Sequence, residues 1–258
     1  MGKFGNQLFQ VAATIGTARA NGCPALFDPG LRWKAEGHLA QRLPRADGRL
    51  PPAREWKEPG FNHHPLTVSG PTDLAGYFQS ERYFSHCADE IRARFAPADA
   101  IAAPLRARYR EVLARQPCSL HVRRTNYLKN PNFAHLCDTD YFERAIATFG
   151  ADTAFLVFSD DIEWCRARFT GNRFVFAHNR LDIEDFFLIS FCAHHVMSNS
   201  SFSWWSAWLN PAADKRVIAP SAWFAGEFGN AALPFTPGPP HHGFFDTRDL
   251  IPAGWEKL

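Results

Sequence analysis

The sequence lacks both a membrane anchor and a secretion signal. No apolar run approaches the roughly 20 residues that a membrane-spanning helix requires. The opening residues MGKFGNQLFQ contain no charged segment followed by a cleavable apolar core. We therefore expect a cytoplasmic protein with at most peripheral membrane association.

The sequence also has little net charge. Its 28 basic side chains nearly balance 26 acidic ones, which leaves a formal charge of +2. Proteins that grip nucleic acid through charge need a strongly basic surface, so no nucleic acid partner is expected. With 258 residues, 46% of them hydrophobic, the chain is long enough to form one large domain or two smaller ones.

Cysteine pairs of the CxxC kind are absent. The six cysteines are scattered, and most stand in apolar segments, which is typical of reduced, buried thiols rather than of disulfides or metal ligands. They are Cys23, Cys87, Cys118, Cys137, Cys165 and Cys192.

The first part of the chain has only weak periodicity. Apolar residues at helical spacing predict a helix over 8–22, preceded by a Gly-Asn turn. Such a turn normally follows a strand, so we expect either that the natural chain starts earlier or that an edge strand is missing. Residues 24–71 are rich in Pro, Gly, Arg and His, which predicts short strands and long loops. Helices are expected over 88–95 and 103–115.

From residue 118 onward, short apolar strands alternate with helices of about ten residues, which is typical of a parallel sheet covered by helices. The predicted domains are residues 1–112 and 113–258. The predicted strands are 118–122, 154–161, 173–178, 194–199 and 216–224, and the predicted helices are 162–169, 183–193 and 200–210.

Three polar clusters follow strands of this predicted sheet: HVRR at 121–124, FSDD at 158–161 and MSNSS at 197–201. Ligands of parallel sheets bind beyond the carboxyl ends of the strands, so these clusters are expected to converge on one site.

The first cluster contains two adjacent arginines. Strand residues two apart share a face, so His121 and Arg123 are expected to point the same way and Arg124 the opposite way. Arg123 is the better phosphate ligand, because its planar fork binds phosphate oxygens in pairs without a metal. Arg124 is then expected to hold either the loop or the opposite domain in place. The alternative is two surface arginines in unrelated salt bridges.

The other two clusters leave several functions open. Asp160 or Asp161 could accept hydrogen bonds from guanine, hold a divalent metal, or cap the next helix. The segment 198–201 could bind a phosphate at a helix N-terminus or form an ordinary cap. The tryptophans that follow, Trp204, Trp205 and Trp208, have helical spacing and are expected in the core rather than as a sugar-stacking platform.

Five segments, in this order, resemble the α-1,2-fucosyltransferases of glycosyltransferase family eleven: GKFGNQLFQ, GYFQSERYF, HVRRTNYLKNP, FSDD and SNSSFSWWSAWLNP. The resemblance implies an α/β, GT-B-like fold of two facing Rossmann-like domains, with the acceptor side in the N-terminal one. It further implies GDP-L-fucose as donor, no cofactor or metal, inversion at the anomeric carbon, and transfer to the 2-hydroxyl of a terminal galactose.

The resemblance also implies a role for each motif. Arg123 would bind the β-phosphate and stabilise the departing charge, and His121 with Asp160 or Asp161 would hold the guanosine. Ser200 and Ser201 would cradle the diphosphate. The remaining donor-binding residues would be Arg124, Ser198, Asn199, Phe202, Gly5, Asn6 and Gln7.

One position departs from the family pattern, because Asn126 stands where the family has Asp. An amide cannot accept a proton, so a base would have to come from His135, Asp138 or Asp140, unless the family's Asp only orients the loop. The alternatives are a GDP-sugar-binding protein without turnover and a transferase with another GDP-sugar donor. Acceptor contacts are expected from 24–71 and GYFQSERYF, and a role in bacterial surface polysaccharide is implied.

Overall fold

The structure is a computed structural model that describes residues 2–28, 42–44, 46–47, 50–236 and 241–258. The chain forms two compact units. Unit 1 comprises Met1–Ala96 and Glu227–Pro252, and unit 2 comprises Pro97–Gly226 and Ala253–Leu258. Part of the predicted loop region 24–71 lies outside the described residues.

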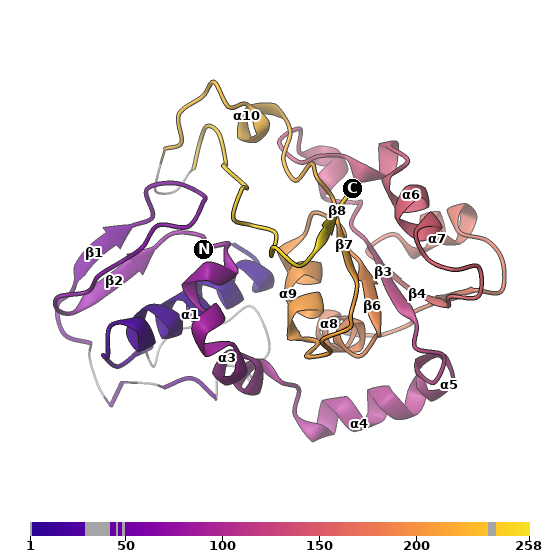
Figure 1. Ribbon diagram of the computed structural model, residues 1–258, viewed down its shortest axis with the longest axis horizontal. Helices are drawn as coiled ribbons and strands as arrows, with labels where there is room; N and C mark the ends of the chain where they lie inside the picture. The colour runs from indigo at the N-terminus through magenta and orange to yellow at the C-terminus, as the bar shows by residue number, and fades with distance from the viewer. Residues whose placement is uncertain (1, 29–41, 45, 48–49, 237–240) are drawn as a thin grey trace. The chain divides into compact units, whose positions relative to one another are not determined.

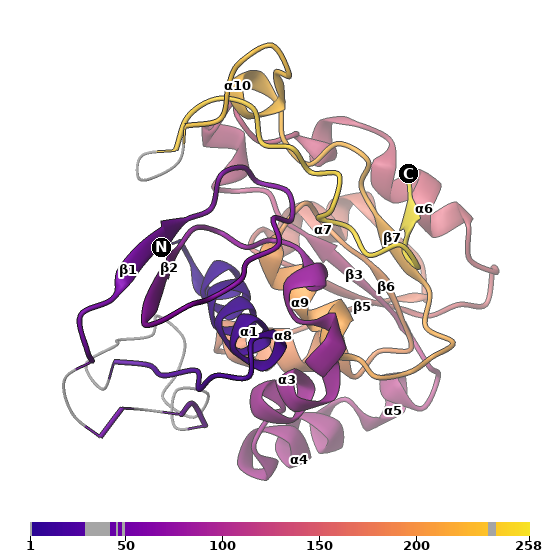
Figure 2. The same ribbon diagram turned by 60° about the vertical axis from the view of Figure 1, so that its left-hand side comes forward.

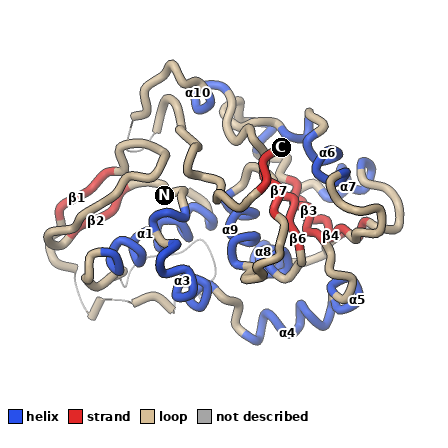
Figure 3. The backbone as a smooth tube through the Cα atoms, in the orientation of Figure 1, coloured by secondary structure: helices blue, strands red, loops and turns tan. Residues whose placement is uncertain are grey.

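Unit 2 is built on six parallel strands in the order β5-β4-β3-β6-β7-β8, shown in red in Figure 3. β3 is buried along its whole length, as its apolar run predicts. It pairs with β4 on one side and β6 on the other. The strands are β3 (Cys118–Val122), β4 (Phe155–Ser159), β5 (Phe174–Phe176), β6 (His194–Val196), β7 (Val217–Ala219) and β8 (Glu256–Lys257).

Helices cover both faces of this sheet, with α6 and α7 on one face and α8 and α9 on the other (Figure 1). The helices of unit 2 are α4 (Asp99–Arg108), α5 (Arg110–Leu113), α6 (Tyr141–Ala147), α7 (Ile162–Arg168), α8 (Asp182–Ser190) and α9 (Ser201–Leu209). α10 (Gly226–Gly229) lies where unit 2 passes into unit 1.

Every strand and helix predicted from residue 118 onward is present, although the last predicted strand shortens to Val217–Ala219. The predicted helix over 103–115 is divided at Tyr109, which is buried and donates its hydroxyl to Asn179 Oδ1 at 3.0 Å. α6 and β8 were not predicted. β8 has only two exposed residues, too few to show a pattern.

The two units meet after Ala96, whereas the predicted domain boundary lies between residues 112 and 113. α4 and α5 belong to unit 2, where the Arg106 guanidinium lies 3.9 Å from the centre of the Phe191 ring. The segment 227–252 also belongs to unit 1, because Phe245 stacks on Phe61 with ring centres 4.7 Å apart.

Unit 1 contains a long helix and a small parallel sheet. α1 is tightly packed: a Cβ atom at Gly16 would lie 2.1 Å from the Tyr83 carbonyl oxygen, so only glycine fits there. The elements are α1 (Phe4–Ala20), β1 (Arg54–Lys57), β2 (Thr72–Ala75), η1 (Glu81–Tyr83), η2 (Ser85–Cys87) and α3 (Ala88–Phe95), and Figure 2 shows α1 beside α3.

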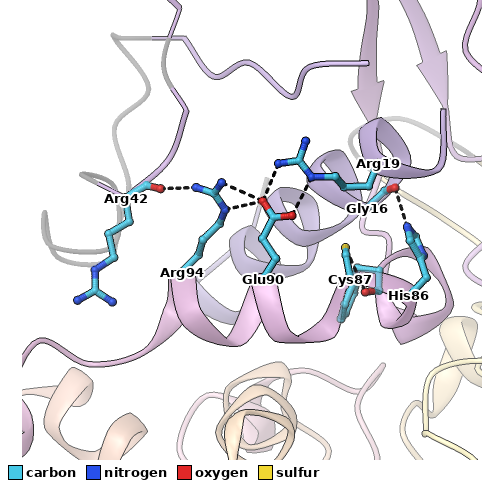
Figure 4. A network of polar contacts seen from close by, with 8 residues as sticks. Gly16, Arg19, Arg42, His86, Cys87, Glu90 and Arg94 are labelled. Atoms are coloured by element: carbon cyan, nitrogen blue, oxygen red, sulfur yellow. Dashed lines mark hydrogen bonds and ion pairs between the residues drawn. The ribbon is translucent and has the colours of Figure 1, made fainter. Parts of the chain in front are cut away.

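A carboxylate joins α3 to α1 and to the preceding loop (Figure 4). Glu90 accepts from Arg19 Nε and Nη2, both at 2.8 Å, and from Arg94 Nε and Nη2 at 3.0 and 2.9 Å. Arg94 also donates to the Arg42 carbonyl oxygen at 2.7 Å. The hydrogen bond from Arg19, followed by that from Arg94, lowers the pKa of Glu90 to about 2, so the network is ionised at neutral pH.

A second carboxylate, Glu58, holds the turn after β2. It accepts from the backbone N–H groups of Tyr77 at 2.7 Å and Phe78 at 3.0 Å. Phe78 has a φ of 53°, a conformation that is costly for a bulky residue. Burial raises the pKa of Glu58 to about 7, so the carboxyl that supports this strained turn titrates near neutrality.

No helix within the described ranges is long and apolar enough to cross a membrane. All six cysteines are free, and Cys118, Cys137, Cys165 and Cys192 are buried.

Glu58→Gln should change how stability depends on pH. The native state holds a proton on Glu58 between pH 4.5 and about 7, where the unfolded chain releases it. The free energy of unfolding of the wild type, relative to the variant, should therefore fall by about 3 kcal/mol as pH rises through this window. Urea unfolding at several pH values measures this difference. Glu55→Gln, an exposed change on β1, the strand that ends one residue before Glu58, is the control. If the difference in unfolding free energy between the wild type and Glu58→Gln does not change with pH, this account of Glu58 is contradicted.

Candidate functional site

The three polar clusters lie at one edge of the sheet of unit 2, as predicted. They follow β3, β4 and β6, and β3 stands between the other two strands. The residues after β3 thus lie between the FSDD acids and the SNSS segment. We name residues 123–130 the arginine loop.

The two arginines of this loop pair with different acids. Arg123 Nη1 lies 3.2 Å from Asp160 Oδ2, and Arg124 Nη1 lies 2.6 Å from Asp161 Oδ2. The Arg124 guanidinium also lies 5.3 Å from the centre of the Trp164 ring, which adds a cation–π contact. Arg124 therefore fastens the loop to α7, in agreement with its predicted supporting role.

Asp160 holds the arginine loop with both carboxylate oxygens. Oδ1 accepts from the Arg124 backbone N–H at 2.9 Å, and Oδ2 accepts from the Thr125 hydroxyl as well as from Arg123. Burial opposes ionisation of this carboxyl. The hydrogen bonds from Thr125 and Arg124, with the nearby Arg123 charge, nevertheless keep its pKa below the ordinary value. Asp160 is thus an anion at neutral pH.

Asp161 is a helix cap, one of the functions left open by the sequence. Its Oδ1 accepts from the Trp164 backbone N–H at 3.2 Å while Oδ2 binds Arg124. Protein donors therefore already occupy all four oxygens of Asp160 and Asp161. The strand ends place both acids against the arginine loop, and a contact of either acid with guanosine stays a prediction.

The SNSS segment divides into buried and accessible residues. Asn199 Nδ2 donates to the carbonyl oxygens of Ala134 at 3.0 Å and Trp223 at 2.8 Å. Ser198 is also fully buried and donates to Asn199 Oδ1 at 3.2 Å. These two side chains join loops within unit 2, and their contact with the donor stays a prediction.

The next two serines open the helix. Ser200 is the N-cap of α9, and its hydroxyl accepts from the Phe202 backbone N–H at 3.3 Å. Ser201 is half-buried at the first helical position. The N-terminus of α9 thus offers backbone N–H groups and a hydroxyl beside the arginine loop, which suits an anion.

His121 lies at the end of β3 as a neutral ring. Burial, followed by the charge of Arg123, lowers its pKa to about 3. The ring stacks on Phe202 with centres 5.5 Å apart, and its Nδ1 is buried without a hydrogen-bond partner among the described residues. A neutral imidazole on an aromatic ring can meet an uncharged ligand group such as a nucleoside.

The candidate bases lie on the segment after the arginine loop. His135 Nδ1 is 3.6 Å from Asp138 Oδ2, and His135 Nε2 is 3.2 Å from the Asn130 carbonyl oxygen. Asp140 is exposed and lies 3.6 Å from Arg144 of its own helix. Asn126 is an exposed residue of the loop itself.

Gly5, Asn6 and Gln7 lie in unit 1, in the first turn of α1 rather than in the predicted turn before a helix. Asn6 Oδ1 accepts from Gln79 Nε2 at 2.9 Å, which joins the GKFGNQLFQ motif to GYFQSERYF.

Sequence reasoning missed three residues of this site. Thr125 donates to Asp160, Trp223 accepts from Asn199, and the Tyr127 hydroxyl donates to the Asn199 carbonyl oxygen at 2.9 Å. The aromatic residue directly after HVRRTN was a usable signal for Tyr127. Trp223 gave none, because its contact is made by a backbone oxygen.

Known proteins with similar sequences identify the family. A sequence model described as Glycosyl transferase family 11 matches residues 54–235. The chain belongs to this family. Among the part of the chain that the structure describes, no cluster of three or more His, Cys, Asp or Glu residues could hold a metal ion.

Relatives in the family include two proteins of Escherichia coli and one of rabbit. The O-antigen biosynthesis glycosyltransferase WbnK is 38% identical over 42% of this chain, and an alpha-1,2-colitosyltransferase is 31% identical over 65%. Galactoside alpha-(1,2)-fucosyltransferase 2 of Oryctolagus cuniculus is 29% identical over 81%. The alignments cover 39%, 61% and 65% of these relatives, so the chain spans less than two thirds of each.

A solved structure confirms the predicted fold class. NodZ alpha-1,6-fucosyltransferase, from crystals soaked with GDP-fucose, superposes with a TM-score of 0.53 at 14% identity. The match covers 85% of this chain and 92% of NodZ. The α/β, GT-B-like class expected from the sequence is thereby confirmed.

Asp160→Ala should destabilise unit 2, because it leaves Arg123, the Arg124 N–H and Thr125 without their acceptor. Such a loss costs about 2 to 3 kcal/mol, and Asp160→Asn, which can still accept one of these bonds, should cost about half. Since the pKa of Asp160 is lowered, its ionic contribution is present at neutral pH and disappears as acid protonates it. Urea unfolding at pH 7 measures both variants.

Asp140→Ala is the control for this prediction, because its exposed pair with Arg144 should contribute less than about 0.5 kcal/mol. Equal effects of Asp160→Ala and Asp140→Ala would refute the clamping role of Asp160.

Proposed function

We propose that this protein is an inverting galactoside α-1,2-fucosyltransferase that moves L-fucose from GDP-L-fucose to the 2-hydroxyl of a terminal galactose. The observation that carries the proposal is the placement of Arg123 beside the N-terminus of α9 in a chain of glycosyltransferase family 11. The names of the rabbit and E. coli relatives support the linkage and a bacterial surface polysaccharide acceptor.

In this proposal the diphosphate lies between the arginine loop and α9. Arg123 binds the β-phosphate, with Ser201 and the first N–H groups of α9 on the same anion. The galactose 2-oxygen forms a bond to fucose C1 as the bond from C1 to the phosphate oxygen breaks, and the electron pair leaves with GDP. Arg123 stabilises this added charge more in the transition state than in the ground state.

The other residues orient the donor and move the proton. The neutral His121 ring, resting on Phe202, meets the nucleoside. Asn126 cannot take the acceptor proton, so His135 accepts it. Its Nδ1 faces Asp138, and its Nε2 must leave the Asn130 carbonyl oxygen to receive the proton. Asp140 is less suited, because it pairs with Arg144 on its own helix. Acceptor contacts come from unit 1, and the enzyme acts without a cofactor, in the cytoplasm.

One relative supports a second candidate donor. Because an alpha-1,2-colitosyltransferase is 31% identical, the donor sugar could differ from fucose while the linkage stays the same. Incubation with lactose and either GDP-L-fucose or GDP-colitose, with and without EDTA, separates the two donors. We expect GDP release and fucosyl-lactose at the same rate in EDTA. Product only from GDP-colitose would refute fucose as the donor, and loss of activity in EDTA would refute metal independence.

Arg123→Ala should lower kcat/KM for GDP-fucose by about 100-fold, because one preorganised donor to the leaving group contributes about 3 kcal/mol. Arg110→Ala on the exposed face of α5 removes the same side chain away from the site and should leave the rate unchanged. Steady-state GDP release measures both. If Arg123→Ala stays within about threefold of the wild type, Arg123 does not bind the leaving group.

Asn126→Asp tests how this chain replaces the family's Asp. If Asp only orients the loop, the variant should turn over within about threefold of the wild type, whereas His135→Gln should lose at least about tenfold. Measured initial rates with lactose decide this. A large gain from Asn126→Asp in a nearly inactive wild type would show instead a GDP-sugar-binding protein that has lost turnover.

A further inference from the structure

Tyr127 connects two loops that leave different strands. It begins the short helix η3 (Tyr127–Lys129) within the arginine loop. Its hydroxyl donates to the Asn199 carbonyl oxygen at 2.9 Å, across 72 residues of sequence. The ring stacks on Phe133 with centres 4.2 Å apart and planes 11° from parallel. The tyrosine is therefore fixed at both its ring and its hydroxyl.

The bond reaches the segment that opens α9. Asn199 directly precedes Ser200, the N-cap of that helix. The Asn199 side chain is held in turn by the carbonyl oxygens of Ala134 and Trp223. Through one hydrogen bond, Tyr127 thus sets the distance between the arginine loop and the N-terminus of α9.

The hydroxyl stays a donor throughout the physiological pH range. Burial raises the pKa of Tyr127 to about 12, although the Arg123 charge and a hydrogen bond with Ser200 oppose the rise. The phenol therefore remains protonated while the enzyme works.

We propose that Tyr127 is a positioning residue that sets the spacing between Arg123 and the N-terminus of α9, so that both bind one diphosphate. The proposal rests on the proposed function. The arginine loop is fixed to Asp160 and Asp161 on one side and to Asn199 on the other. Without the tyrosine hydroxyl, the loop keeps its contacts with the two acids and the stacking of the ring on Phe133, but it loses the hydrogen bond from Tyr127 to the segment that opens α9. The loop then stays folded, but the two groups that hold the diphosphate can move apart.

The proposal predicts a loss confined to the phosphate part of the ligand. Two anion-binding groups held at a fixed distance bind a diphosphate better than two groups that must first be ordered. The nucleoside contacts through His121 and Phe202 do not depend on this spacing. Removal of the hydroxyl should therefore weaken binding of GDP and leave binding of guanosine unchanged.

Tyr127→Phe tests this, because it deletes the hydroxyl and keeps the ring on Phe133. We expect Kd for GDP, measured by calorimetry, to rise by about fivefold with Kd for guanosine unchanged, and kcat with GDP-fucose and lactose to fall by about tenfold. Ser190→Ala is the matched control. It deletes a hydroxyl that donates to the Phe187 carbonyl oxygen at 2.7 Å, at the end of α8 remote from the site.

The outcomes separate this inference from the proposed function. If the wild type binds GDP but transfers no fucose, the proposed function fails, and the ratio of the GDP and guanosine constants still tests Tyr127. An unchanged ratio in Tyr127→Phe overturns the inference, even in an active enzyme. A parallel loss of GDP and guanosine binding also overturns it, because that pattern shows general damage. Thermal unfolding of Tyr127→Phe shows at which temperatures the variant is folded, and binding is measured within that range.

Discussion

The ion pair between Arg123 and Asp160 is the interaction on which the rest of the site depends. A guanidinium at the end of a buried strand is costly unless an anion faces it. Asp160 supplies that charge at 3.2 Å, and the same carboxylate also binds the backbone of Arg124 and the hydroxyl of Thr125. One side chain therefore neutralises the arginine and shapes the loop that carries it. In the proposed function, the Arg123 guanidinium is therefore already in place when a diphosphate binds.

The polar residues of the site fall into two groups: one holds the loops together, and the other is assigned to ligand binding in the proposed function. Asp160, Asp161 and Asn199 are saturated by protein partners and hold the loops after β3, β4 and β6 together. In the proposed function, Arg123 and the opening residues of α9 bind the anion. The site obtains its positive charge from an arginine and a helix N-terminus, both of which are fixed by neighbouring strands of one sheet.

The sequence predicted the architecture of unit 2 well, because short apolar strands and ten-residue helices each leave a distinct pattern. It also predicted that polar clusters follow neighbouring strand ends. The parity argument for Arg123 and Arg124 does not apply directly, because β3 ends at Val122 and both arginines lie beyond it. The sequence did not predict contacts between residues that lie far apart in the chain. The hydrogen bonds from Tyr127 to Asn199 and from Asn199 to Trp223 depend on how loops meet. The association of Glu227–Pro252 with unit 1 depends on aromatic packing. The motif GKFGNQLFQ was assigned to a turn because its polar residues hid the first turn of α1.

The most direct test of the central claim is a crystal structure of the complex with GDP, grown without divalent cations. The account predicts Arg123 nitrogens within about 3 Å of β-phosphate oxygens and the Ser201 N–H on the same diphosphate. Asp160 should still hold Arg124 and Thr125. Phosphates bound away from Arg123, or a loop released from Asp160, would contradict it.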